Sequence, residues 1–472
     1  MPDHTQAASA VTPPLVTLRL ARHLTTSRPE ALPGAVRHEA ARTFVNWLGC
    51  AVGGCRHQAV DAALAALSPF SGPRTASVLG RNEKLDPLHA SLVNGIASHV
   101  FDFDDTHLGT VIHPAGPVAS ALLAFAQHQP IAGRDFVNAL VLGVDTECRI
   151  GNAVFPEHYD VGWHITGTAG VFGAAAAIGK LLGLDAERMA WALGLAASQP
   201  VGLREMFGSM TKSFHPGRAA QNGMTAALLA ANGYTSSTAP LEARRGWLNV
   251  LSSRNNPAEI TDALGERYEI LANTYKPFAC GIVIHPTIDG CLQLRAKGID
   301  AGAIETVALK VHPLVLELTG KTEPRTGLEG KFSIYHAAAV ALVEGDGGEE
   351  QFSDRAVADP AVVALRRRVT AAIDPSLAPD AAHVAIALAN GSRAELAVEH
   401  AIGSIARPMT DADLERKFLA LVSPHLGDAR AGHLLELAWR IESLDSAAAV
   451  AEAASPRSCS MQSYEKRTGG RP

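Results

Sequence analysis

Helical patterns with apolar residues on most faces run through the first half of this chain and constrain its fold more than any other feature. Around residues 35–52 the apolar side chains recur at the spacing of one helix face: Ala41, Phe44, Val45, Leu48 and Val52. Further helical patterns cover residues 14–24, 57–68, 116–127, 134–153, 167–182, 186–198 and 218–232. Several are rich in Ala all round, as expected of helices that are buried on more than one side. We therefore predict a large all-helical domain.

The pattern changes after about residue 270. Residues 304–312 alternate between apolar and polar, which is typical of a strand. Residues 383–400 predict a hairpin that turns at Asn390-Gly391, a pair favoured in tight turns. Helical patterns at 333–344 and 359–372 lie between these strands, and two more follow at 411–423 and 431–454.

These patterns predict a mainly α protein with a smaller α+β domain inserted into the helical one. The boundaries we expect are 1–272 for the first part of the large helical domain, 273–404 for an α+β lid domain, 405–456 for the return to the helical domain, and 457–472 for a disordered tail.

Charge and composition narrow the possible partners. The formal net charge of −6 is mild and argues against nucleic acid as a partner. No apolar run approaches the ~18 residues that a membrane span needs, and the N-terminus lacks the pattern of a secretory signal. The six cysteines have no C-x-x-C spacing, so neither a zinc ribbon nor a disulfide framework is expected. We predict a cytoplasmic protein with no membrane and no nucleic-acid partner.

An acidic stretch, Val100–Pro114, follows a helix that should begin at the N-cap Asp86. The stretch contains Asp102, Asp104, Asp105, Thr106, His107 and His113. Carboxylates repel one another and resist burial, so such a cluster needs an explanation in so apolar a chain. A helix end followed by an acidic cap, or a solvated acidic loop, would explain it without any chemistry.

Metal sites are weaker explanations of the acidic stretch. A magnesium–diphosphate site would need a second acidic set facing the first, and the sequence offers none. A metal bound by Asp105, His107 and His113 would mix carboxylate and imidazole ligands without clean spacing. We therefore expect no metal and no other cofactor.

Three other stretches also place titratable groups beside Gly, Pro or Thr at expected helix boundaries: Gly162–Thr168, Ser209–Gly217 and Tyr275–Pro286. With the acidic stretch they offer His113, His164, Lys212, His215, Lys276 and His285. A single histidine in such a place is usually structural, but four such places in one chain are harder to dismiss. Lysines and helix N-termini bind carboxylates, and histidines exchange protons near neutral pH. Together these residues indicate a site for a small anionic carboxylic acid that undergoes proton transfer.

The chain resembles the MmgE/PrpD family in a set of motifs that occur in the same order over about residues 35–440. They are HVFDFDDTH with HP following, GWHITGTAGVFGAAAAIGKLLGLD, TK-x-x-HPG, KPFAC with a later HP, and KFSIYHAAAVAL. The resemblance implies a large all-α domain built from both ends of the chain, a smaller α+β lid, a cofactor-free site between them, and a homodimer. The family includes 2-methylcitrate dehydratase, cis-aconitate decarboxylase and iminodisuccinate epimerase.

Site residues follow from these motifs by resemblance. The candidate catalytic residues are Asp102, His113, His164, Lys212 and Lys276, and the candidate substrate-binding residues are Thr106, Arg204, His215, Tyr335 and His336. One departure concerns Tyr335-His336, where family dehydratases tend to carry Pro-Tyr after F-S-I. His336 then stands in the place of the family's tyrosine, which leaves substrate and reaction type open.

The family chemistry is proton movement at a carbon next to a carboxylate. We expect Lys212 and Lys276 to stabilise the enediolate-like charge, and His113 or His164 to move the proton. Asp102 would orient a histidine or a lysine.

Three functions remain open at this point. We favour a hydro-lyase acting on 2-methylcitrate or a close relative. The first alternative is a decarboxylase or an epimerase that uses the same site, and the second is a non-catalytic scaffold that binds an anion.

Overall fold

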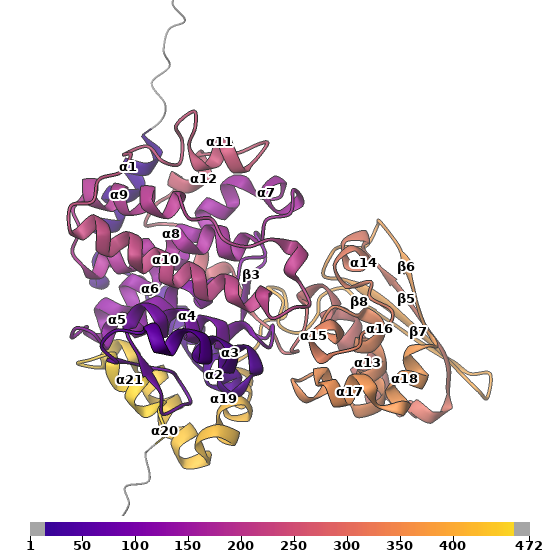
Figure 1. Ribbon diagram of the computed structural model, residues 1–472. Helices are drawn as coiled ribbons and strands as arrows, with labels where there is room; N and C mark the ends of the chain where they lie inside the picture. The colour runs from indigo at the N-terminus through magenta and orange to yellow at the C-terminus, as the bar shows by residue number, and fades with distance from the viewer. Residues whose placement is uncertain (1–14, 457–472) are drawn as a thin grey trace, which may run out of the picture.

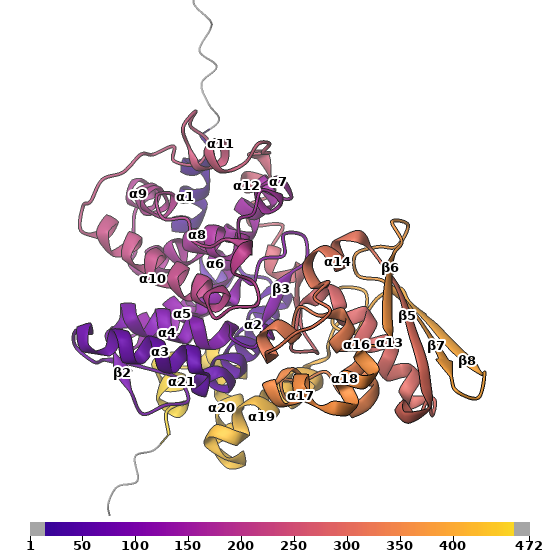
Figure 2. The ribbon, with the colours of Figure 1, turned by 45° about the vertical axis from the view of Figure 1, so that its right-hand side comes forward.

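The computed structural model describes residues 15–456, so the expected disordered tail at 457–472 lies outside the described residues. The chain forms a large body of helices beside a smaller body that contains a sheet (Figures 1 and 2). The fold is therefore mainly α with a smaller α+β domain, as predicted. The expected domain boundaries themselves stay a prediction.

The large body, which we call the helical domain, contains helices from both ends of the chain. They are α1 (Val16–Thr26), α2 (Gly34–Gly53), α3 (Gln58–Leu67), α4 (Pro87–His99), α5 (Ala115–Ala126), α6 (Gly133–Val154), α7 (Glu157–Asp160), α8 (Ile165–Leu181), α9 (Ala186–Ala197), α10 (Thr211–Ala231), α11 (Trp247–Leu251), α12 (Ala258–Thr261), α19 (Asp411–Leu426), α20 (Asp428–Trp439) and α21 (Ala448–Ala453). Helix α10 packs against α4, α8 and α9, and α19 packs against α2. The C-terminal helices, yellow in Figure 1, thus complete a body that the N-terminal helices begin.

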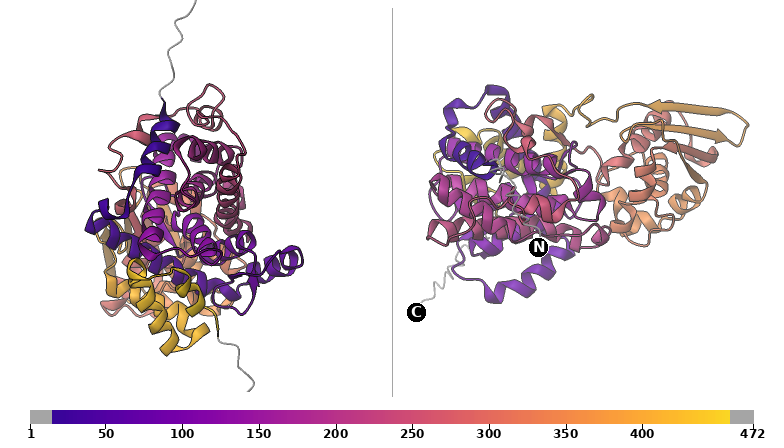
Figure 3. Two further views of the ribbon diagram at one scale, coloured as in Figure 1. Left: turned by 90° about the vertical axis from the view of Figure 1, so that its left-hand side faces the viewer. Right: turned by 90° about the horizontal axis from the view of Figure 1, so that it is seen from above.

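The smaller body, which we call the small domain, has helices on a four-stranded sheet. Its elements are α13 (His285–Ala296), β5 (Ile304–Val311), α14 (Pro313–Thr319), α15 (Gly327–Gly330), α16 (Ile334–Glu344), α17 (Asp354–Ala358), α18 (Pro360–Arg366), β6 (Val369–Ile373), β7 (Ala382–Leu388) and β8 (Arg393–Val398). The strand order is β6-β5-β7-β8, with β5 and β6 parallel and the other pairs antiparallel. The β7–β8 hairpin lies at the end of the small domain far from the helical domain (Figure 3).

Two short strand pairs lie outside this sheet. One joins β1 (Ala76–Ser77) to β2 (Lys84–Leu85), and the other joins β3 (Asp105–His107) to β4 (Asn273–Tyr275). The second pair has the greater consequence, because β3 belongs to the acidic stretch and β4 leads directly into Lys276. The sequence did not predict it.

Three expected elements differ from the structure. Helix α10 begins at Thr211 rather than at residue 218, and Pro216 lies inside it, where it removes one backbone hydrogen bond near the helix start. The helix expected over 359–372 ends at Arg366, and residues 369–373 form strand β6 instead. The pattern over 431–454 is divided into α20 and α21.

Two local signals are confirmed. The Asp86 side chain accepts hydrogen bonds from the backbone N–H groups of Leu88 and His89, so it is the N-cap of α4. Gly391 has φ +83°, as the tight turn at the hairpin requires. Within residues 15–456, none of the helices has the length and apolar character that crossing a bilayer would demand.

Candidate active site

A close crossing of α4 and α10 brings the first site residues together. A methyl group on Gly95 of α4 would lie 2.4 Å from Cα of Gly217, and one on Gly217 of α10 would lie 2.3 Å from the carbonyl oxygen of Leu92. No side chain fits at these distances, so the two helices touch backbone to backbone. As a result His99, at the end of α4, lies beside Lys212, in the first turn of α10.

Asp102 binds two lysines at the centre of the site. Its Oδ1 accepts hydrogen bonds from Nζ of Lys212 and Nζ of Lys276, each at 2.7 Å. All three side chains are buried. Burial disfavours the charged carboxylate, but the two ammonium groups prevail and hold the pKa of Asp102 well below its usual value. The carboxylate is thus in contact with both lysines, and its role in orienting them stays a prediction.

The β3–β4 pair explains how two distant motifs meet. Thr106 pairs with Thr274, whose hydroxyl donates to the Thr106 carbonyl at 2.8 Å. Asp102 precedes β3 and Lys276 follows β4, and because the strands are antiparallel these flanking residues lie at the same end of the pair.

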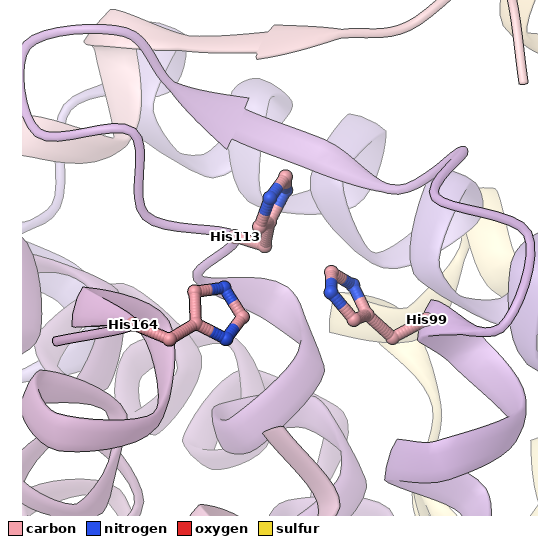
Figure 4. A group of neighbouring side chains, drawn as sticks. All are labelled: His99, His113 and His164. Carbon is pink, nitrogen blue, oxygen red and sulfur yellow. The ribbon is translucent and has the colours of Figure 1, made fainter. Parts of the chain in front are cut away.

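One ring nitrogen of His113 is hydrogen-bonded, and the other has no hydrogen bond to the described residues. Figure 4 shows the His113 ring near those of His99 and His164. Its Nδ1–H donates to the Asp105 carbonyl at 2.8 Å, and the Thr106 hydroxyl lies 3.2 Å from the same nitrogen. Burial lowers the pKa of His113 to about 3, with Lys276 adding to the effect against Asp104. The imidazole is thus neutral at pH 7, and because a carbonyl only accepts hydrogen bonds, the lone pair is on Nε2.

The imidazoles of His164 and His215 are hydrogen-bonded to each other. Their Nδ1 atoms lie 2.8 Å apart, so one donates and the other accepts. Burial holds the pKa of His164 well below its usual value and lowers that of His215 to about 4. The ring of His164 lies 6.3 Å from that of His113, centre to centre.

His99 is a site residue that the sequence reasoning missed. Its Nδ1 lies 2.6 Å from Oδ2 of Asp104, and its buried Nε2 has no hydrogen-bond partner among the described residues. Its ring centre is 4.8 Å from that of His113 (Figure 4). In the sequence it lies at the end of the helix that precedes the acidic stretch, and no role was predicted for it. Its place next to that acidic stretch was the signal that could have identified it.

Three of these residues, His99, Asp102 and Lys212, border a cavity between the two domains, whereas His113, His164 and Lys276 do not line it. The cavity is narrow, because its free volume is only about 20 Å³, which is room for about one water molecule. On the side of the small domain it is lined by Leu328, Lys331 and Phe332. An open groove of about 580 Å³ shares Leu328 and Lys331 with the cavity, so it marks the side from which a ligand would arrive.

None of the five predicted substrate-binding residues lines the cavity, and three of them have contacts elsewhere. Arg204 lies over the ring of Tyr159 and donates to Glu317 of α14 at 2.8 Å, which links the two domains. Tyr335 lines a separate surface groove. His336 is buried in the small domain, where its Nε2–H donates to the Gln351 carbonyl at 2.9 Å. Their roles in binding stay predictions.

The remaining two lie close to the catalytic candidates. Thr106 contacts His113, and His215 contacts His164, as described above. His285, another residue that the sequence singled out, is buried with its Nε2 unpartnered among the described residues.

The site holds groups that could ligate a metal ion as well as groups that could bind an anion, and one such set is His99, Asp102, Asp104 and His113. His99, His113 and His164 offer nitrogen atoms within 4.8 Å of one another, which is a spacing that a metal could draw together. The ammonium groups of Lys212 and Lys276, however, meet at Asp102 beside these imidazoles, and they would repel a cation. The alternative set with Asp105 and His107 is not assembled, because His107 is bonded to Thr110 and Glu269.

The chain is similar to known proteins over most of its length. The model of the MmgE/PrpD N-terminal domain matches residues 18–260, and that of the MmgE/PrpD C-terminal domain matches residues 278–442. A cis-aconitate decarboxylase from Aspergillus terreus is 26% identical over 88% of this chain and 90% of its own length. The cis-aconitate decarboxylase from Mus musculus is 26% identical over 80% of each chain. A 2-methylcitrate dehydratase from Cupriavidus necator is 24% identical over 80% of this chain and 82% of its own length.

Proposed function

The chain belongs to the MmgE/PrpD family, and on that basis we propose that it is a lyase acting on a small di- or tricarboxylic acid. The observation that carries the proposal is that the Lys212 ammonium and the His99 imidazole line one cavity, with the neutral imidazole of His113 next to His99. A lysine ammonium has three N–H groups, and among residues 15–456 Lys212 donates only to Asp102. Its other N–H groups are available to a substrate carboxylate.

The proposed reaction begins with His113. Its neutral Nε2 takes a proton from the carbon next to a substrate carboxylate, and the electron pair moves into that carboxylate as an enediolate-like charge. The ammonium of Lys212, held in place before the substrate arrives, stabilises this charge. The rings of His99 and His164 lie near that of His113, and burial lowers the pKa of both.

Dehydration is the first candidate reaction, and these protonation states are compatible with it. After the proton is removed, the electron pair forms a carbon–carbon double bond and expels the hydroxyl group, which leaves as water once it is protonated. His164 is poorly suited to supply that proton, because burial keeps it neutral. We assign the proton to Lys212, since burial lowers the pKa of its ammonium and makes it a stronger acid than an exposed lysine.

Decarboxylation is the second candidate, and the relatives favour it. The decarboxylases from Aspergillus terreus and Mus musculus each match at least 80% of this chain. In that reaction the bond between carbon and a carboxylate breaks, CO₂ leaves, and the electron pair stays on carbon. The same ammonium would stabilise the charge and return a proton to the carbon.

Product identification separates these reactions. The purified protein is incubated with 2-methylcitrate, citrate, cis-aconitate and an aspartate-derived diacid, and the products are identified by mass spectrometry. Loss of water identifies the dehydratase, release of CO₂ the decarboxylase, and a change of optical rotation at constant mass an epimerase. Binding measured by calorimetry without turnover of any acid would contradict the proposal and leave the anion-binding scaffold.

The homodimer and the cytoplasmic location that the sequence suggested stay predictions. Light scattering on the purified protein tests the first, and fractionation of cells tests the second.

A further inference from the structure

Three consecutive backbone carbonyls of the acidic stretch each accept a hydrogen bond from a different lysine. Nζ of Lys331 lies 2.8 Å from the Phe101 oxygen, Nζ of Lys276 lies 3.1 Å from the Asp102 oxygen, and Nζ of Lys417 lies 2.5 Å from the Phe103 oxygen. We call residues 101–103 the Asp102 segment. Its three donors come from the small domain, from the residue after β4, and from α19 near the C-terminus.

The ammonium groups of Lys331 and Lys417 have no donor left for a substrate. Beyond the Asp102 segment, Lys331 donates to the Ala279 carbonyl at 2.8 Å and to Glu349 at 2.6 Å. Lys417 donates to Asn46 Oδ1 at 2.8 Å and to the Lys276 carbonyl at 2.9 Å. Each uses three hydrogen bonds, which is all that an ammonium group can make. They differ in this from Lys212.

The Asp102 segment needs such support because its backbone is strained. Asp102 has φ +50°, in the left-handed region, which is unfavourable for a residue with a side chain and persists only when the surroundings enforce it. Asp102 must also keep its carboxylate within reach of two ammonium groups at once. Phe103 is buried and Phe101 is partly buried, and besides Lys417 the Phe103 oxygen has only the weak thiol donor of Cys50 at 3.4 Å, so losing a lysine would leave these oxygens poorly satisfied.

We propose that Lys331 and Lys417 are positioning residues, which hold the Asp102 segment so that Asp102 presents Lys212 and Lys276 to the substrate. The proposal rests on the proposed function, since it assigns to these lysines a role in the same reaction. Lys417 acts on both sides of the site, because it bonds the carbonyl next to Asp102 and the carbonyl of Lys276 itself. Lys331 carries the contribution of the small domain.

The protonation of Lys417 gives the proposal a signature in pH. Cys50, Asp104, Asp105 and Lys276 are the titratable groups that face it. Burial lowers the pKa of Lys417 to about 8. Above that pH the amine keeps only two N–H groups for its three acceptors, so one carbonyl loses its donor. An arginine stays charged in this range and would remove this alkaline loss.

The test compares K417M and K331M with K180M. Lys180 is the matched control, because its ammonium also donates to two backbone carbonyls, those of Thr25 and Ser27, away from the cavity. We expect kcat to fall on the order of 10- to 100-fold in K417M and K331M, with KM changed less, because a displaced Asp102 misplaces the reacting groups. K180M should keep the kcat of the wild type.

Two further readouts distinguish positioning from a merely structural role. K417R should restore kcat at pH 7 and extend activity to higher pH than the wild type. Hydrogen–deuterium exchange should quicken in peptides covering residues 101–105 of K417M and K331M, and stay unchanged there in K180M.

A kcat within twofold of the wild type in both K417M and K331M would overturn the proposal. If K417M does not fold, K331M decides alone, because it reaches the same segment from the small domain. If the wild type turns over none of the acids, the proposed function fails, while the exchange measurement still tests whether these lysines hold the segment.

Discussion

The two walls of the cavity differ in the kind of side chain that they contribute. The helical wall supplies groups that can exchange protons or bind charge, namely His99, Asp102 and Lys212, with His113 behind them. The small-domain wall supplies Leu328, Phe332 and Lys331, and the ammonium of Lys331 is fully occupied by protein oxygens. The reacting groups therefore belong to one domain, whereas the other mainly shapes the space.

This difference indicates a division of labour. Changes on the helical wall should alter the rate of the chemical step with every substrate. Changes on the small-domain wall should alter which acid is preferred, because they change the shape of the cavity and leave the proton-transfer groups in place.

Replacing His113 by Gln should have the largest effect. Gln keeps a donor for the Asp105 carbonyl but offers no basic nitrogen, so kcat should fall on the order of 10²–10⁴-fold with every acid tested. Steady-state kinetics measure this, with H128Q on the exposed surface as the control. An unchanged kcat would show that His113 is not the base of the reaction.

Replacing Lys212 by Met should come next. Met keeps the packing between Phe207 and Phe332 but removes the charge, so kcat should fall on the order of 10²–10³-fold. K180M serves as the control, and circular dichroism shows whether the fold is kept. A variant that binds the acid more weakly but keeps kcat at saturating substrate would contradict this. It would show that Lys212 binds the substrate and the transition state equally well.

Replacing Leu328 by Ala should sharpen the contrast between the walls. The ratio of kcat/KM for 2-methylcitrate and citrate, which differ by one methyl group, should shift on the order of tenfold. The kcat for the preferred acid should stay within about threefold of the wild type. L396A on β8, away from the cavity, should leave both quantities unchanged. A large fall in kcat with every acid would instead show that Leu328 affects the chemical step, as residues of the helical wall are expected to do.

Replacing Asp105 by Asn should have the smallest effect, on stability. Burial, with Asp104 nearby, raises the pKa of Asp105 to about 7, against about 4 in an unfolded chain. Between these values the folded state binds more protons at Asp105 than the unfolded state does. The free energy of unfolding of the wild type should therefore fall as pH rises from about 4 to about 7. The Tm of the variant relative to the wild type should rise across this range by about 1–3 °C. A constant difference in Tm from pH 4 to 8 would contradict the raised pKa.

Local signals in the sequence predicted much of the fold. Asp86 and Pro87 predicted the start of α4, and Asn390-Gly391 predicted the β7–β8 hairpin, because the responsible interactions span only a few residues. The start of α10 was missed because a proline normally ends a helix, and nothing local shows that Pro216 is tolerated there.

The site was predicted less completely because its contacts are long-range. Motif resemblance indicated Asp102, Lys212 and Lys276, and the structure brings them together. Lys331 and Lys417 were missed, since a lysine's role depends on which carbonyl it meets, and these carbonyls lie 230 and 314 positions away in the chain. The sequence also suggested His336 as a substrate contact, whereas the fold of α16 turns its ring toward Gln351.

The dependence of the Asp102 segment on α19 has a consequence for how the protein is made. A ribosome releases the N-terminus first, so Asp102 emerges long before Lys417 does. Until α19 has been synthesised, the carbonyl oxygens of Phe103 and Lys276 both lack the Lys417 ammonium, and the Phe103 oxygen has only the Cys50 thiol at 3.4 Å. If Lys417 has the positioning role proposed above, a nascent or C-terminally truncated chain that forms its other helices would hold the Asp102 segment less firmly, so that the order of this segment would report completion of translation.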